Sequence, residues 1–132
     1  MKKSLLVFLT LFSALCYSQV ETVLKSFNTE EISINPLIKG TVYLPLKQNK
    51  KTNLVLLIAG SGPTDRDGNQ KGITNNSLKY VSEELAKNDI AVFSYDKRIL
   101  AQMKAGTVNE ATLTFDDFIT DATAVLLFFN IL

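Results

Sequence analysis

The 132-residue sequence contains no histidine and one cysteine, and these shortages exclude several kinds of site. Without histidine, the chain lacks the commonest general base, a frequent metal ligand and the side chain that titrates near neutral pH. A complete Ser-His-Asp triad therefore cannot form from these residues. One cysteine cannot form an internal disulfide, so the fold has to depend on its apolar core.

The sequence also lacks an excess of charge of either sign. Its 14 basic and 13 acidic residues give a net charge of +1, which argues against a nucleic-acid partner and against an acidic tail. Apolar residues make up 46% of the chain, a proportion typical of one small globular domain. We expect recognition through shape and local groups, with no cofactor and no bound metal.

Residues 1–18 have the pattern of a secretory signal peptide. Two lysines near the start precede an apolar run over residues 5–15, which is too short to span a bilayer. Small residues then predict cleavage near Ser18 and Gln19, and a secreted or periplasmic mature chain that does not contact the membrane. A lipid anchor on Cys16 is the less favoured alternative, because a leucine stands where that processing signal normally has a small residue.

Apolar spacing predicts an α/β fold that opens with a β-hairpin. The first strand includes Ile32 and Ile34, Asn35 and Pro36 form the turn, and residues 38–44 form the second strand.

A strand, a helix and a second strand are predicted to follow the hairpin. Residues 54–59 are apolar without alternation, which is typical of a central strand covered on both faces of a parallel sheet. Apolar positions recur at helical spacing over residues 77–88, with Ser77 as the expected N-cap. Residues 90–95 form the next buried strand.

The last predicted helix covers residues 115–129, and Thr114 with Asp117 predicts a capping box at its start. The sequence then ends on apolar residues without a glycine stop or a basic last turn, which indicates an interrupted domain. A terminal helix that packs on its own core is the alternative.

The candidate site residues follow the first buried strand. They lie in the loop Gly-Ser-Gly-Pro-Thr-Asp-Arg-Asp-Gly-Asn at positions 60–69. Open α/β sheets bind ligands at the carboxyl ends of their strands. Gly60 and Gly62 permit a sharp turn and leave main-chain amides accessible, so the loop is suited to holding a developing negative oxygen. Ser61 is not expected to be a nucleophile, because alanine and proline occupy the two positions where a nucleophile elbow has glycine.

The same loop has a second interpretation. Asp65, Asp67 and Asn69 have the alternate spacing of a calcium-binding loop, but Gln70 stands where that loop needs glycine for its sharp turn. The alternative to an enzyme is a non-enzymatic secreted binding module that uses the Asp65–Asn69 loop to hold a sugar, a cation or a partner.

In combination, the glycine loop, the Tyr-Asp-Lys-Arg step at residues 95–98 and the Phe-Asp-Asp-Phe helix start at residues 115–118 resemble exported bacterial α/β-hydrolases of the serine esterase and serine aminopeptidase type. The resemblance covers residues 20–130. It implies the N-terminal half of an α/β-hydrolase fold, a β-hairpin followed by strand-helix-strand-helix, in a partial domain over residues 19–132. The implied substrate is a carboxylic ester or a peptide carbonyl.

The resemblance also implies roles for individual residues. The backbone amides of Ser61 and Gly62 match one half of the oxyanion hole. Asp96 and Arg98 match a pair that braces the oxyanion loop, although isoleucine follows that arginine where many relatives have glycine, so we expect a different path for the chain there. The other residues implied to support the loop are Gly60, Asp65, Arg66 and Asp67.

The nucleophile, the acid and the histidine of the family come later in its sequences, so no catalytic residue is expected in this chain, which should be inactive alone. In the family topology, the strand at residues 90–95 lies between the hairpin and the strand at residues 54–59, whose other neighbour carries the nucleophile. Without that neighbour, residues 54–59 form a bare apolar edge. The sequence therefore predicts poor solubility and self-association through this strand edge.

Overall fold

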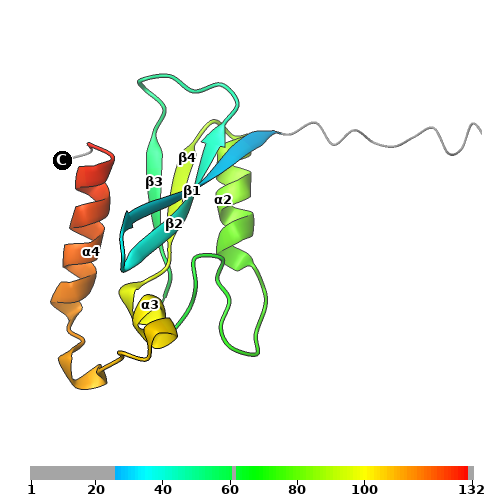
Figure 1. Cartoon of the computed structure of the whole chain (residues 1–132). Helices are drawn as coiled ribbons and strands as arrows, with labels where there is room; N and C mark the ends of the chain where they lie inside the picture. Colours follow the sequence, from blue (N-terminus) through cyan, green and yellow to red (C-terminus); the bar gives the residue numbers. More distant parts are fainter. Residues whose placement is uncertain (1–25, 61, 131–132) are drawn as a thin grey trace, which may run out of the picture.

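The structure is a computed structural model, and it describes residues 26–60 and 62–130. The predicted signal peptide at residues 1–18 lies outside the described residues. The described chain forms a mixed four-stranded sheet with helices on both faces (Figure 1). Its elements are β1 (Phe27–Asn35), β2 (Ile38–Pro45), β3 (Leu54–Ile58), α2 (Ser77–Lys87), β4 (Ala91–Tyr95), α3 (Arg98–Ala105), the 3-10 turn η1 (Glu110–Thr112) and α4 (Phe115–Phe128). None of the described helices is long and apolar enough to cross a bilayer.

The strands lie in the order β1-β2-β4-β3. β1 and β2 form the predicted hairpin, and the side-chain oxygen of Asn35 closes its turn by accepting from the amides of Leu37 and Ile38, at 2.8 and 2.9 Å. β4 pairs antiparallel with β2 and parallel with β3, which confirms the α/β prediction and the expected neighbours of β4. The prediction from composition that β3 is central is wrong, because β3 is an edge strand of the described sheet and its residues are half-buried or exposed.

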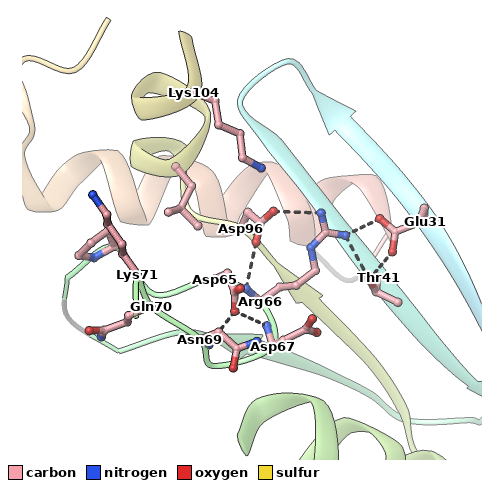
Figure 2. Close-up of a pocket in the computed structure, with 12 residues that line it drawn as sticks. Glu31, Thr41, Asp65, Arg66, Asp67, Asn69, Gln70, Lys71, Asp96 and Lys104 are labelled. Atoms are coloured by element: carbon pink, nitrogen blue, oxygen red, sulfur yellow. Dashed lines mark hydrogen bonds and ion pairs between the residues drawn. The ribbon is translucent and has the colours of Figure 1, made fainter. Parts of the chain in front are cut away.

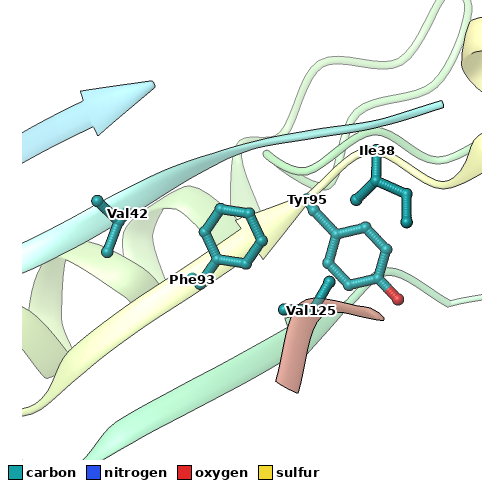
Figure 3. Close-up of a cluster of buried hydrophobic side chains, with 5 residues drawn as sticks. All are labelled: Ile38, Val42, Phe93, Tyr95 and Val125. Atoms are coloured by element: carbon teal, nitrogen blue, oxygen red, sulfur yellow. The ribbon is translucent and has the colours of Figure 1, made fainter. Parts of the chain in front are cut away.

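The sheet carries a core on each face, because side chains alternate between the two sides of a strand. Helix α2 packs on one face around Tyr43, Ala86 and Val92. Helix α4 covers the other face around Phe93 and Val125, and Figure 3 shows this cluster. All five residues of β4 are buried, since the strand lies between two neighbours and between the two helical layers.

The helix ends differ in how well the sequence predicts them. α4 has the predicted capping box, in which the amide of Thr114 donates to the carboxylate of Asp117 at 2.9 Å. The prediction for α2 is wrong, because Ser77 is its first residue and Asn76 occupies the cap position in a left-handed conformation, with φ of 52°. Helix α3 has no counterpart in the sequence prediction, because its start carries neither a capping side chain nor an acidic first turn.

Candidate functional site

The glycine loop connects β3 to α2 and begins at the carboxyl end of β3, beside the carboxyl end of the parallel strand β4 (Figure 1). Open α/β sheets place their ligands at this end. Asp96 and Lys97 directly follow β4, and both side chains reach the loop. The residues that follow β4 therefore decide how the loop is held.

Arg66 anchors the middle of the loop to the end of β4 (Figure 2). Its backbone amide donates to Oδ1 of Asp96 and its guanidinium donates to Oδ2, both at 2.9 Å. The Ser94 hydroxyl donates to the Arg66 carbonyl at 2.7 Å. Because the Arg66 and Asp96 side chains are only 17% and 15% exposed, this charge-assisted pair is shielded from water and fixes the loop.

The other side of the Arg66 guanidinium contacts the hairpin. It donates to Glu31 of β1 at 2.5 Å and to the Thr41 hydroxyl of β2 at 3.1 Å. Burial alone would lower the pKa of Arg66, but its hydrogen bonds and charge interactions with Asp96 and Glu31 outweigh burial and raise that pKa above its usual value. The guanidinium therefore stays charged and links β1, β2 and the end of β4 to the loop.

Two polar side chains hold the shape of the loop from inside. Oδ1 of Asp65 accepts from the amides of Asp67 and Asn69, at 3.0 and 2.7 Å. The side-chain oxygen of Asn69 accepts from the amides of Asn75 and Asn76, both at 2.9 Å. Both oxygens therefore satisfy amides of the loop backbone.

Asp67 and Gly68 join the loop to helix α2. The Asp67 carbonyl accepts from the amides of Leu78 and Lys79 in the first turn of the helix, at 3.1 and 3.3 Å. Gly68 has a φ of 94°, and a Cβ there would lie 2.5 Å from a hydroxyl of α2, so this position requires glycine. Burial, and then the negative charge of Asp65, raise the pKa of the Asp67 carboxyl.

Lys97 holds the glycines at the start of the loop. Its ammonium group donates to the carbonyls of Gly60 and Gly62, the latter at 2.5 Å. The residue is 3% exposed, and burial lowers the pKa of the ammonium group. In the part of the chain that the structure describes, no carboxylate forms an ion pair with it. The sequence interpretation missed this residue, because its place two positions after β4 does not distinguish it from a lysine on the surface.

Arg98 contacts α4. Its guanidinium donates to both carboxylate oxygens of Asp121, at 2.9 and 2.6 Å, and also to Asp117. The Asp121 side chain is 4% exposed, so the pair fixes α4 to the end of β4. Of the two residues implied to brace the loop, Asp96 contacts it, whereas the described partners of Arg98 lie on α4. The chain after Arg98 continues directly as α3.

The loop borders two depressions of opposite character. A polar pocket of about 440 Å³ contains Arg66 and Asp96 (Figure 2). An apolar groove of about 750 Å³ lies between the end of β3 and α4, with Lys97 and the two loop glycines in its wall. The groove is also lined by Ile99 of α3, by Leu113, and by Phe115, Phe118, Ile119 and Ala122 of α4.

Of the two residues implied to form the oxyanion hole, the structure describes Gly62. Ser61 lies outside the described residues. Gly62 has a φ of 77°, a conformation that glycine adopts without strain. The described ranges contain no group of three or more carboxylate or cysteine side chains placed to hold a metal ion. Comparisons with models of protein families, with curated proteins and with solved structures found no match.

Proposed function

We propose that this chain supplies the oxyanion-binding part of a secreted serine hydrolase with an α/β-hydrolase fold, acting on carboxylic esters or peptide carbonyls. The observation that supports the proposal is a glycine loop at the carboxyl end of β3, held by Lys97 at its start and by the pair of Arg66 and Asp96 further along. An oxyanion hole needs donors that are fixed before the reaction, because donors that must reorganise stabilise the developing charge less.

In the proposed reaction, a serine from outside these residues attacks the carbonyl carbon and a histidine takes the serine proton. The substrate oxygen becomes an anion, and the amides of Ser61 and Gly62 donate to it. Lys97 contributes indirectly, because it binds the carbonyls of Gly60 and Gly62 and so keeps these acceptors from the anion. The sequence has no histidine, so the chain alone is proposed to be inactive.

The coding sequence after Leu132 is the first test. We expect a continuation, in frame or after a frameshift, that encodes a Gly-x-Ser-x-Gly elbow and a later histidine. A stop codon followed by unrelated sequence would contradict the proposal and favour the binding module. A fluorophosphonate probe should leave residues 19–132 unlabelled, and labelling that is lost in Ser61→Ala would instead identify Ser61 as a nucleophile.

Two matched glycine substitutions in the complete reading frame test the role of the loop. Gly62 and Gly72 have φ of 77° and 81°, so alanine strains the backbone similarly at both. Alanine keeps the N–H of residue 62, so Gly62→Ala acts through strain that turns this amide away from the proposed hole, and it should lower kcat by up to about 100-fold with little change in KM. Gly72→Ala should leave both constants unchanged. Equal effects at the two positions would contradict the assignment.

Export is part of the proposal, with residues 1–18 as the signal peptide. N-terminal sequencing of the protein recovered from the periplasm or the medium should begin at Gln19. A lipid-modified N-terminus at Cys16 would establish the anchored alternative. A product that keeps residues 1–18 and stays in the cytoplasm would contradict export.

A further inference from the structure

A second polar pocket lies on the face of the sheet that α2 covers, and its volume is about 370 Å³. The hairpin strands supply its floor, which includes Tyr43, while Asp67 of the loop and Glu83 of α2 lie in its walls. All of its lining residues lie between positions 27 and 83, on the β1 side of the sheet. A strand that follows the described chain and pairs with β3 would lie at the opposite edge, so the pocket does not depend on where the sequence ends.

Tyr43 of β2 is a buried polar residue of this pocket. Its ring packs against Ala86 and Val92, and the residue is 4% exposed. Among the residues that the structure describes, none forms a hydrogen bond with the Tyr43 hydroxyl, although the side chain lines the pocket. A buried hydroxyl without a partner is costly, so this one indicates a partner that enters the pocket.

The surroundings of the Tyr43 hydroxyl are negatively charged. Burial raises the pKa of Tyr43 from 10.0 to about 12, and three carboxylates around it add to this effect. They belong to Asp67, Glu83 and Glu31, and the opposing effect of Arg66 is the smallest. Glu31 is bound to Arg66, but in the described ranges the carboxylates of Asp67 and Glu83 form no ion pair. The pocket therefore has two carboxylates available for a positively charged ligand.

Lys79 also lines the pocket, but it does not neutralise these carboxylates. Its charge lowers the pKa of the Asp67 carboxyl, whereas burial and the charge of Asp65 raise that pKa by more. The balance leaves the carboxylate of Asp67 destabilised, because it is partly removed from water without a bonded cation. A cation that reaches Asp67 would relieve this cost.

We propose that the pocket binds the ammonium group of a small organic amine, with Tyr43, Asp67 and Glu83 as its acceptors. An ammonium group has three N–H donors, and these side chains offer acceptor oxygens from β2, the loop and α2. The rings of Phe27 and Tyr43, with centroids 6.1 Å apart, supply an apolar surface for the alkyl chain. A metal ion fits less well, because the described ranges hold no group of three or more carboxylates placed to coordinate one. This site does not depend on the proposed hydrolase activity.

An NMR titration of residues 19–132 with butylamine tests the site. Butylamine is protonated at neutral pH, and 1-butanol, which has the same alkyl chain without the charge, is the control ligand. Butylamine should cause saturable shifts of the backbone amides of Tyr43, Asp67 and Glu83, and 1-butanol should cause none. Added salt should weaken the binding, because it screens the attraction between the ammonium group and the carboxylates.

Two adjacent glutamates of α2 provide matched variants. Glu83→Gln removes a carboxylate of the pocket and should raise the dissociation constant of butylamine about 10-fold. Glu84→Gln is the control, because Glu84 pairs with Lys87 at 3.4 Å outside the pocket, so the constant should not change. Tyr43→Phe removes only the hydroxyl and should raise the constant about 5-fold. Circular dichroism verifies that each variant is folded.

Four results would overturn the proposal. Butylamine that causes no saturable shift would show that the pocket does not bind an amine, and 1-butanol that shifts the same amides equally would show that charge is not recognised. Equal dissociation constants in Glu83→Gln and Glu84→Gln would place the amine elsewhere on the chain. Calcium chloride that shifts the same amides at lower concentration than butylamine would assign the pocket to a metal ion.

Discussion

The two edge strands of the described sheet differ in how well they are protected from pairing with another strand. We call β1 the protected edge and β3 the open edge. β1 carries acidic residues and an irregular register, and its Glu31 is joined to the glycine loop through Arg66. β3 is apolar, leads into the glycine loop and has no neighbour on its outer side in the described sheet. The candidate functional loop therefore begins at the open edge. A strand that completes the sheet at β3 would also lie beside that loop.

The largest loss of stability is expected when the contact between the protected edge and the loop, which Arg66 makes, is removed. Arg66→Met leaves the Asp96 carboxylate, which is 15% exposed, without its guanidinium partner and should lower the free energy of unfolding by roughly 3 kcal/mol. Urea unfolding measures the change. Lys87→Met is the control, because Lys87 pairs with Glu84 at the surface and its loss should cost less than about 1 kcal/mol. Equal losses in the two variants would contradict a buried anchor at Arg66.

Lys97, which holds the start of the loop after the open edge, should make stability depend on pH in the alkaline range. Burial lowers the pKa of its ammonium group in the folded chain from the ordinary 10.5. Between the folded and unfolded pKa values, the unfolded chain binds a proton that the folded chain has released, so stability rises with pH. The stability of the wild type relative to Lys97→Met should therefore grow toward pH 10.5, by at most about 1.4 kcal/mol per pH unit. Urea unfolding from neutral to alkaline pH that shows a constant or shrinking difference would refute this.

Tyr95 lies on β4, one of the two inner strands of the described sheet, and provides an internal reference for these comparisons. It is 1% exposed, and its hydroxyl has no hydrogen-bond partner among the residues described. An unpaired buried hydroxyl is costly, so Tyr95→Phe should raise the free energy of unfolding by roughly 1 kcal/mol at neutral pH. Destabilisation by this variant would mean that the hydroxyl has a partner in solution.

The same residue predicts a loss of stability in alkali. Burial, and then the charge of Asp121, raise the pKa of Tyr95 from 10.0 to about 12. In that window the unfolded tyrosine has lost its proton while the folded one keeps it, so the wild type loses stability as pH rises. Tyr95→Phe should lose less stability than the wild type over the same pH range in urea unfolding.

The smallest change in stability is expected for a substitution on the protected edge itself. The Glu31 side chain is 70% exposed, so Glu31→Gln should change the free energy of unfolding by less than about 1 kcal/mol. Water screens this side of the Arg66 guanidinium, whereas the side that faces Asp96 is shielded. Urea unfolding in which Glu31→Gln is as harmful as Arg66→Met would show that the β1 edge, not β4, anchors the loop.

The sequence predicts the elements better than it predicts their neighbours. Apolar periodicity locates the hairpin, β3, α2, β4 and α4, because each buries at least one face. It misplaces β3, since an apolar strand has the same composition whether or not a neighbour covers its outer side. It misses the cap of α2, whose first amides are satisfied by a carbonyl of the distant residue Asp67.

The anchors of the loop are long-range contacts, which sequence spacing does not reveal. Asp96 reaches Arg66 across 30 positions, and Lys97 reaches Gly60 across 37. The resemblance drew attention to Asp96 and Arg98, but nothing local distinguishes Lys97 from a lysine on the surface. Only the pairing of β3 with β4 brings it beside the glycines.

The open edge of β3 is tested most directly by amide hydrogen exchange in residues 19–132. Val55 and Leu56 provide the comparison. The carbonyl of Asn53 accepts from the amide of Ala91 on β4, and backbone groups alternate along a strand, so the amide of Val55 points to β4 and that of Leu56 points outward. In dilute solution Leu56 should exchange about 100-fold faster than Val55, and in concentrated solution the difference should shrink as the self-association predicted from the sequence covers the edge. A Leu56 amide that is protected at every dilution, or that gains no protection at high concentration, would contradict an edge that is open and accepts another strand.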